Sequence, residues 1–280
     1  MAQLDRSRLD VELVRRGLAR ARGHAHELVA AGRVQVGDRF ARKSGEQVDA
    51  ATHLSVRPGP GPEYVGRGAL KLASLLQELA PAAAHGLVEG RRCVDAGAST
   101  GGFTQVLLER GAAQVVAVDV GRDQLAATLR GDERVVNRPG TSVRGLGPAD
   151  VGGQVDLLVA DLSFISLRVV WADLSGLVRR GGDLLVLVKP QFEVGRERLG
   201  SGGVVRDAAQ RVEAVLSVAR AGADLHGLAV RDVRASRWPG PSGNVEYFLW
   251  MSRHDHPPLS EDQLLALRRQ VQAVVRGGPQ

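Results

Sequence analysis

Hydrophobic residues recur along most of the chain in two alternating spacings. Short apolar runs typical of buried strands occupy 92–96, 114–119, 134–137, 155–161, 183–188, 227–235 and 245–251. Apolar residues at helical spacing predict helices over 102–110, 122–130, 167–179, 207–221 and 259–275, and from Gly68 to Pro81. Repeated strand–helix units indicate an α/β fold with a mostly parallel sheet and helices on both faces. The last two strands have no helix between them, so we expect the final strand to enter antiparallel.

The amino end follows a different pattern. Apolar residues at helical spacing predict a helix over 8–18 and a second, shorter one over 24–31 that ends at Gly32. Residues 33–39 then alternate and turn like a strand entering a hairpin. Two helices and a hairpin describe a small α+β module.

A change of composition separates the two patterns. Residues 56–63 interleave three prolines with glycines, a composition that resists both helix and sheet and is typical of a linker. We therefore expect a small domain over 1–57, a linker over 58–65 and a large domain over 66–280.

Positive charge is concentrated in the small module. The net charge is +6 over 280 residues, with an isoelectric point near 10.3. The first 60 residues hold eleven Arg or Lys against seven Asp or Glu, which leaves an excess of only two for the rest of the chain. A concentrated basic patch favours a polyanionic partner, with RNA or DNA as the first hypothesis. The alternative is a basic surface that is merely solvated.

Composition excludes several classes of protein. Hydrophobic residues make up 44% and charged residues 24%, as in globular proteins, and no apolar run approaches the roughly 18 to 20 residues that span a bilayer. We expect a cytoplasmic protein and favour a monomer. The single Cys93 excludes intramolecular disulfides and a cysteine zinc cluster, and its predicted strand makes it a core residue. No metal site is expected.

A glycine-rich turn, Asp95-Ala-Gly-Ala-Ser-Thr-Gly-Gly-Phe-Thr104, joins the first strand of the large domain to a helix. Its spacing, Gly-x-x-x-Gly-Gly, differs from the Gly-x-Gly-x-x-Gly of dinucleotide folds and from a phosphate loop. Asp95 can face the cationic amino-acid portion of a ligand, and Asp119 ends the next strand, where a carboxylate suits ribose hydroxyls. Asp119 alone would fit NAD equally well, so the turn decides for S-adenosylmethionine. The candidate cofactor-binding residues are Asp95, Gly97, Ser99, Thr100, Gly101, Gly102, Asp119 and Asp161.

Charged residues end two of the apolar strands. Asp161 follows the run from Val155, and Lys189 follows the run from Leu184. A charge in such a place is costly to desolvate unless it is used or paired. Lys71 on the first helix of the large domain and Glu246 on the last strand complete a candidate catalytic set. The alternative is a purely structural ion-pair network.

Six ordered blocks carry a resemblance to a known family. They are Gly-Arg-Gly-Ala-Leu-Lys-Leu (66–72), the turn at 95–104, Ala-Asp-Leu-Ser-Phe-Ile-Ser-Leu (160–167), Leu-Val-Lys-Pro-Gln-Phe-Glu-Val-Gly (187–195), Gly-Gly-Val-Val (202–205) and Pro-Ser-Gly-Asn-Val-Glu-Tyr-Phe-Leu (241–249). Together they resemble the TlyA family of FtsJ-related RNA 2′-O-methyltransferases, once labelled haemolysins. The resemblance implies a Rossmann-like class I methyltransferase sheet and a Lys-Asp-Lys-Glu tetrad, here Lys71, Asp161, Lys189 and Glu246. In actinobacterial members it implies methylation of cytidine ribose in 16S and 23S rRNA, with sensitivity to capreomycin and viomycin as a consequence.

The small module resembles the αL-type RNA-binding domain first described in a small-subunit ribosomal protein. The matching residues are Leu9-Asp10, Leu13-Val14, Arg15-Arg16-Gly17-Leu18, Ala25, Leu28-Val29, Ala31-Gly32 and Val34-Gln35-Val36. The usual Ser or Thr helix cap is missing near Ala21, and the hairpin turn reads Gly-Asp rather than Asn-Gly. The candidate RNA-binding residues are Arg6, Arg15, Arg16, Arg20, Arg22, Arg33 and, in the large domain, Phe164. Phe164 could stack on a flipped-out base or belong to the core.

Methyl transfer to a ribose hydroxyl assigns roles to the tetrad. Lys189 is the expected base, Asp161 would orient Lys189 and Lys71, and Glu246 would pair with a lysine or position the ribose. Three other functions remain open: a ribosome-binding assembly factor without methyl transfer, a haemolysin, and an NAD-dependent dehydrogenase. Lytic activity conflicts with the lack of a membrane-spanning or strongly amphipathic lytic segment, and the glycine spacing disfavours the dehydrogenase.

Overall fold

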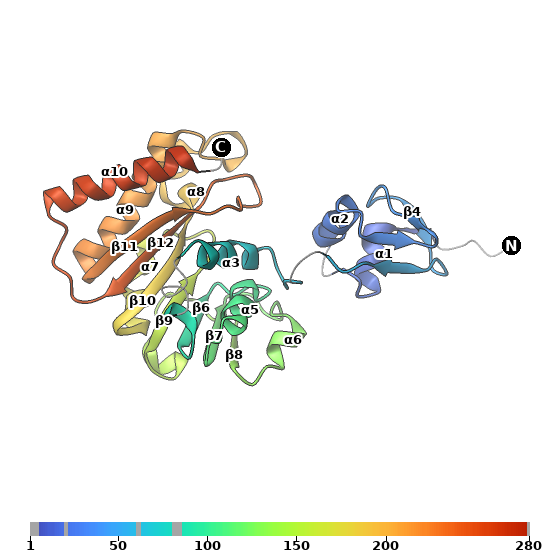
Figure 1. Ribbon diagram of the computed structural model, residues 1–280, viewed down its shortest axis with the longest axis horizontal. Helices are drawn as coiled ribbons and strands as arrows, with labels where there is room; N and C mark the ends of the chain where they lie inside the picture. Colours follow the sequence, from blue (N-terminus) through green and yellow to red (C-terminus); the bar gives the residue numbers. More distant parts are fainter. Residues whose placement is uncertain (1–5, 20–21, 60–62, 80–85, 279–280) are drawn as a thin grey trace. The chain divides into compact units, whose positions relative to one another are not determined.

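The computed structural model describes residues 6–19, 22–59, 63–79 and 86–278 (Figure 1). The chain forms two compact units, Met1–Glu63 and Tyr64–Gln280. Each unit has a hydrophobic core of its own. No described helix is long and apolar enough to cross a membrane.

The small unit packs two helices against short strands. Its elements are β1 (Arg6–Arg8), α1 (Leu9–Arg15), α2 (Arg22–Ala30), β2 (Val34–Val36), β3 (Arg39–Phe40), β4 (Gln47–Asp49) and β5 (Leu54–Val56). β2 lies between β3 and β5, and β1 pairs with β4, all antiparallel. Leu9, Leu13 and Ala25 are fully buried at the centre. α1 ends three residues before the predicted Leu18, because Gly17 takes a positive φ of 70° that an α-helix does not allow.

A seven-stranded sheet forms the middle of the large unit. The strands, in spatial order, are β11 (Leu228–Ala235), β12 (Tyr247–Arg253), β10 (Val178–Val188), β9 (Val155–Ala160), β6 (Arg92–Ala96), β7 (Gln114–Asp119) and β8 (Val135–Pro139). β12 runs antiparallel to both of its neighbours, and the other recorded pairings in this sheet are parallel. The predicted α/β fold and its antiparallel final strand are therefore confirmed.

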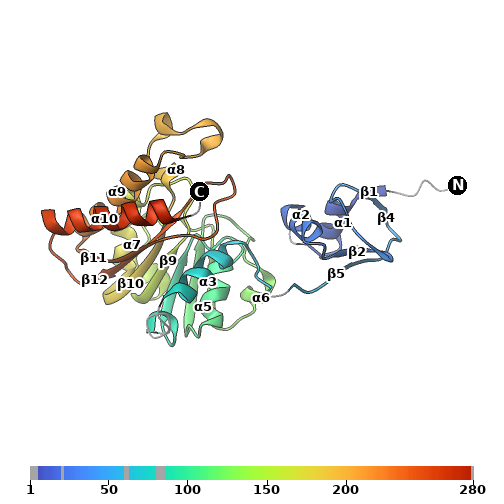
Figure 2. The same cartoon turned by 45° about the horizontal axis from the view of Figure 1, so that its top comes forward.

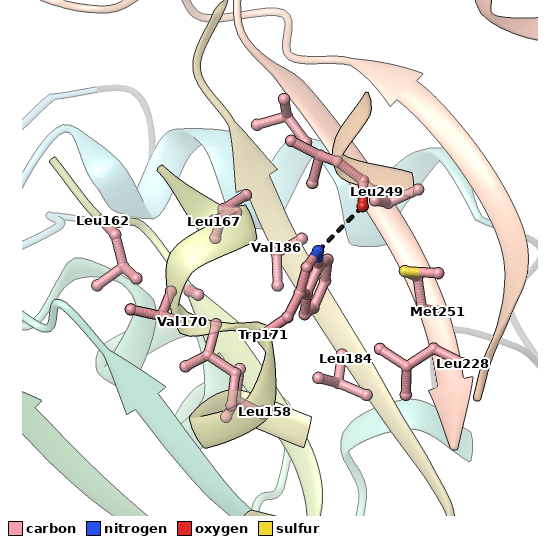
Figure 3. Close-up of a cluster of buried hydrophobic side chains, with 14 of the residues drawn as sticks. Leu158, Leu162, Leu167, Val170, Trp171, Leu184, Val186, Leu228, Leu249 and Met251 are labelled. Atoms are coloured by element: carbon pink, nitrogen blue, oxygen red, sulfur yellow. Dashed lines mark hydrogen bonds between the residues drawn. The ribbon is translucent and has the colours of Figure 1, made fainter. Parts of the chain in front are cut away.

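Trp171 lies at the centre of the core on one face of the sheet (Figure 3). That core joins the strands to α7 (Leu167–Leu177), α9 (Ala208–His226) and α10 (Glu261–Gly277). The Trp171 Nε1 donates a hydrogen bond of 2.9 Å to the carbonyl oxygen of Val218, so the buried ring leaves no indole donor unpaired. α9 and α10 lie side by side (Figures 1 and 2).

The opposite face is covered by α3 (Gly68–Glu78) and α5 (Gly102–Glu109). Leu72 and Leu76 of α3 pack with Phe103 and Leu107 of α5 over the sheet. Cys93 lies fully buried in this core, as predicted. The packing fixes α3, and with it Lys71, against the sheet.

Two predictions from the spacing were wrong in detail, and three short strands were not predicted. The helix predicted over 122–130 is reduced to α6 (Ala127–Arg130), because Asp123 adopts a positive φ of 56°. β10 begins at Val178 rather than 183, through a polar stretch with a register shift that reads as a loop in the sequence. The strands β1, β4 and β5 have three residues each, too few for a period to be detected.

Candidate active site

The sheet topology brings the four predicted catalytic side chains together at one edge. Asp161 directly follows β9, Lys189 directly follows β10, and Glu246 directly precedes β12. Val188 pairs with Tyr247 across β10 and β12, so the residues next to them, Lys189 and Glu246, emerge side by side. Because β12 runs in the opposite direction, its first residues, and Glu246 before them, lie at the edge where the parallel strands end.

The four side chains form one alternating chain of charges. The Lys71 Nζ lies 2.6 Å from Glu246 Oε2 and 3.7 Å from Asp161 Oδ2. The Lys189 Nζ lies 2.6 Å from Asp161 Oδ1. Side-chain exposure is 8% for both lysines, 18% for Asp161 and 1% for Glu246. Charges this well buried persist only when they are paired, and each one here faces an opposite charge.

One oxygen of Glu246 is left over. Its Oε1 is buried and makes no hydrogen bond with any described residue. A Cβ built on Gly240 would lie 2.5 Å from this atom, so only a glycine allows the approach. The Gly240 amide in turn donates to the carbonyl oxygen of Asn244, which closes the loop around Glu246.

Lys189 and Glu246 line a cavity of about 600 Å³. Its walls come from the loops after β9, after β10 and before β12. Lys71 and Asp161 are not among its lining residues. A cavity of this size can receive a drug-sized group.

Phe164 stands at the mouth of this cavity. Its side chain is 92% exposed, which rules out the core role, and its φ of 65° is unusual for a bulky residue. Its ring centroid lies 5.2 Å from that of Phe192. An exposed aromatic ring beside a cavity is available for stacking.

The glycine turn packs against the elements that carry the tetrad. Gly97 has a φ of 84°, and a Cβ there would lie 2.7 Å from the carbonyl oxygen of Asp161. A Cβ at Gly102 would lie 2.7 Å from the amide nitrogen of Ala69 in α3. Gly101 has a φ of 96° and packs on Leu129. We expected these glycines to allow a ligand to approach the backbone closely. In the structure they also allow the close approach of the end of β9 and of α3.

Asp95 is fully buried behind this turn. Its Oδ2 accepts hydrogen bonds from the Thr104 amide, at 2.9 Å, and from the Thr104 hydroxyl, at 2.7 Å. Burial raises the pKa of Asp95 to about 7, against the opposing effect of those two hydrogen bonds. Its Oδ1 makes no hydrogen bond with the described residues. Asp95 thus anchors the first turn of α5 rather than lining open space.

Asp119 lies at the end of β7, beside the turn. Its Oδ2 accepts from the Ser99 amide at 2.8 Å, and its Oδ1 accepts from the Gly121 amide at 2.7 Å. Ser99 has a positive φ of 49°, and the Thr100 hydroxyl lies against Gly66. The next residue, Val120, is 71% exposed, an apolar side chain left uncovered at the carboxyl edge. The sequence analysis missed Val120.

Buried carboxylates neutralise several of the predicted RNA-binding arginines. Arg15 and Arg16 both bind Glu12, and Arg22 binds Asp10. These contacts hold the pKa of both carboxyls near 2, well below their usual range. Two more guanidinium contacts are structural as well. Arg16 also donates to the carbonyl oxygens of residues 49, 50 and 52, and Arg33 donates to Glu63 and to the Arg57 carbonyl.

Arg6 and Arg20 are the two remaining candidates of the small unit. Arg6 is exposed on β1, and Arg20 lies outside the described residues. Arg16 is the least suited to RNA, because its guanidinium ties α1 to the loop before β5 and its side chain is only 21% exposed. The arginine pattern alone could not separate these cases.

Three polar residues were not predicted from the sequence: Ser163 and Asn244, which line the cavity, and Glu193, which binds the lining residue Ser166. Ser163 accepts a hydrogen bond of 2.9 Å from Lys189 Nζ. Glu193, at the end of α8 (Pro190–Glu193), accepts from the Ser166 hydroxyl and the Leu167 amide. Asn244 accepts from the Val205 amide and donates to the Gly203 carbonyl. The sequence indicated these residues only through their positions inside the blocks 160–167, 187–195 and 241–249.

Both units of the chain match known protein families. Residues 64–253 match the FtsJ-like methyltransferase family, and residues 7–53 match the S4 domain. The chain is 51% identical to the 16S/23S rRNA (cytidine-2′-O)-methyltransferase TlyA of Mycobacterium tuberculosis, over 98% of this chain and 99% of the relative. It is 31% identical to hemolysin A of Brachyspira hyodysenteriae, over 86% and 97% of the two chains.

A solved structure from Streptococcus thermophilus, provisionally titled a hemolysin, superimposes with a TM-score of 0.73 at 33% identity. The alignment covers 98% of this chain and 97% of that one, so the likeness includes both units. The chain is a methyltransferase, and it belongs to the TlyA family, which joins an S4 domain to an FtsJ-like methyltransferase domain.

Proposed function

We propose that this enzyme transfers a methyl group from S-adenosylmethionine to the 2′-hydroxyl of cytidine in 16S and 23S rRNA. The observation that carries the proposal is the alternating chain from Glu246 through Lys71 and Asp161 to Lys189, which ends on the wall of a cavity of about 600 Å³. The substrate is that of the relative from M. tuberculosis, which is similar over nearly its whole length.

The residues at the ends of β6, β7 and β9 suit this cofactor. Asp119 offers a carboxylate for ribose hydroxyls, and Val120 offers an uncovered apolar side chain for an adenine ring. Asp161 adds negative charge for the cationic portion. The proposed cofactor-binding set is Asp95, Gly97, Ser99, Thr100, Gly101, Gly102, Asp119 and Asp161, with Asp95 acting through Thr104 and the turn. The bound cofactor supplies a methyl group on a positively charged sulfur.

Lys189 is the proposed base. Of the two lysines only Lys189 lines the cavity, whereas Lys71 lies between Glu246 and Asp161. A neutral Lys189 amine would accept the proton of the ribose hydroxyl while that oxygen forms its bond to the methyl carbon and the carbon–sulfur bond breaks, with its electron pair left on the sulfur. Lys71 holds the two carboxylates in place, and Asp161 orients Lys189. The free Oε1 of Glu246 is available to accept a ribose hydroxyl.

Positioning should contribute more to the rate than proton transfer. General-base assistance is typically worth about 10²- to 10⁴-fold, whereas holding the reactants in line can supply about 7–11 kcal/mol. The buried ion pairs support this view, because they fix the side chains of Lys189 and Glu246 at the wall before a substrate arrives.

The small unit is the proposed RNA anchor. It matches the S4 domain and carries the concentrated positive charge of the chain. Arg6, Arg15, Arg22 and Arg33 keep partial exposure for phosphate contacts, and Phe164 of the large unit is the proposed stacking platform for the target base. Binding should therefore weaken steeply as salt is raised.

Methyl transfer from labelled cofactor to isolated rRNA and to ribosomal subunits tests the proposal. We expect the label on cytidine 2′-oxygens, located by mapping 2′-O-methyl positions in ribosomes from cells with and without the protein. Label on a base would overturn the reaction. Tight rRNA binding with no transfer under any condition would favour an assembly factor instead.

A further inference from the structure

Two neighbours hold the amine of Lys189, and both come from the loop after β9. Asp161 Oδ1 lies 2.6 Å from Nζ, and Ser163 Oγ lies 2.9 Å from it. Ser163 also lines the cavity of about 600 Å³, as does Lys189. The side chain of Lys189 is only 8% exposed, so the cavity is the open direction left to the amine.

Two contacts to a neutral amine fix the direction of its lone pair. A neutral primary amine has two N–H groups and one lone pair. An ionised Asp161 can only accept hydrogen bonds, and the Ser163 oxygen can accept one as well. Ser163 accepts one N–H in a hydrogen bond, and Asp161 attracts the other at ion-pair distance, so the lone pair is turned away from both oxygens and toward the cavity that Lys189 lines. With a single acceptor the amine could rotate and turn its lone pair away.

We propose that Ser163 is a positioning residue that fixes the lone pair of Lys189 toward the acceptor hydroxyl. The inference rests on the proposed function, because it assigns the second of two contacts to the proposed base. Ser163 acts through Lys189 and needs no contact with the methyl donor. Its own O–H is free to donate elsewhere while its oxygen accepts from Lys189.

The loop around Ser163 is held tightly enough for this task. Glu193 Oε2 accepts from the Ser166 hydroxyl at 2.6 Å, and Glu193 Oε1 accepts from the Leu167 amide at 2.8 Å. The Glu193 side chain is 1% exposed. Lys189 precedes α8 and Glu193 ends it, so the same short helix carries the amine and the brace for the loop opposite. The distance from Ser163 to Lys189 is thereby set from both sides.

Serine substitutions with separate measurements of kcat and KM test this inference. In Ser163→Ala we expect kcat for rRNA methylation to fall about tenfold, the effect of one well-aligned hydrogen bond. The KM for rRNA and the cofactor affinity should stay within about twofold, since neither binding surface changes. Ser163→Thr keeps the hydroxyl and should restore kcat to within about threefold of the wild type.

A matched control is Ser217→Ala, whose hydroxyl binds only the Ala214 carbonyl within α9 and should leave all three quantities unchanged. Wild-type kcat in Ser163→Ala would overturn the inference. So would a loss that appears in KM, or one that threonine does not restore. A wild-type protein that fails to methylate ribose would overturn the proposed function as well, so the two failures are distinguishable.

Discussion

Buried carboxylates face cations in the small unit and in the active site of the large unit, but the cations differ. In the small unit Asp10 meets Arg8 and Arg22, and Glu12 meets Arg15 and Arg16. In the large unit Glu246 and Asp161 meet lysines, and one Glu246 oxygen stays without a described partner. Arginine cannot lose its proton in a protein, whereas lysine can. In the small unit the carboxylates and arginines satisfy each other and serve the structure. In the active site one carboxylate oxygen has no described partner, and the lysines are able to exchange a proton.

The largest effect should come from making the active site resemble the small unit. Lys189→Arg keeps the positive charge beside Asp161 but removes a base that can become neutral. Single-turnover methylation should fall at least about 100-fold, while calorimetry should give nearly unchanged cofactor affinity. Lys43→Arg, an exposed lysine of the small unit, is the control. Near-normal turnover by Lys189→Arg would show that the active site does not need a lysine that can lose its proton.

A smaller effect should follow from removing one charge of the buried chain. Glu246→Gln leaves Lys71 with Asp161, 3.7 Å away, as its remaining carboxylate. The free energy of unfolding should drop by about 3 kcal/mol, the lower end for a broken buried pair, because Asp161 remains. Denaturant titration measures it. Glu213→Gln, an exposed partner of Arg268, should change stability by less than about 1 kcal/mol. Equal losses in the two variants would contradict the burial argument.

Acid should unfold the small unit through Asp10 and Glu12. Their pKa values near 2 in the folded state lie below the usual values near 4, so the unfolded chain binds more protons as the pH falls. The stability that they contribute is complete above about pH 4 and is lost between about pH 4 and 2. Amide NMR signals of residues 9–56 report this loss, and tryptophan fluorescence reports only the large unit.

The variant Asp10→Asn tests how much of this acid dependence comes from Asp10. Asp10→Asn should flatten the acid dependence of the small unit, because one of the two groups that titrate is gone while Glu12 remains. An unchanged acid transition in this variant would assign the loss to other carboxylates.

The smallest effect should separate two adjacent arginines of α1. Arg15 is 63% exposed and, among the described residues, binds Glu12, so Arg15→Ala should change stability little. If Arg15 contacts a phosphate, that variant should also lower the salt slope of RNA binding by about one. Arg16→Ala should cost more stability, because three carbonyls lose their donor. Equal stability losses would show that the carbonyl contacts contribute nothing.

Sequence patterning predicted the parts of the fold that are long and uniformly apolar. The strand 114–119 was predicted with its observed ends, because it is apolar up to a terminal Asp119. Three-residue strands such as β4 cannot display a period, and Asp123 stopped a helix through a backbone angle that spacing does not encode.

The tetrad was predictable for a similar reason. Asp161 and Lys189 are charges at the ends of apolar strands, a conflict visible in the sequence. Ser163 is a polar residue in a polar loop and presents no such conflict. Its importance depends on a distance to Lys189, 26 positions away in the chain, which only the fold supplies.

The position of β12 between β10 and β11 has a consequence for synthesis. β11 leaves the ribosome before β12, but its recorded strand partner is β12, so it can join the sheet only after residues 247–253 have been made. Until residues 246–253 emerge and insert, Lys71 lacks its nearest carboxylate and the cavity lacks a wall. The last strand to be made therefore completes both the sheet and the chain of four charged side chains.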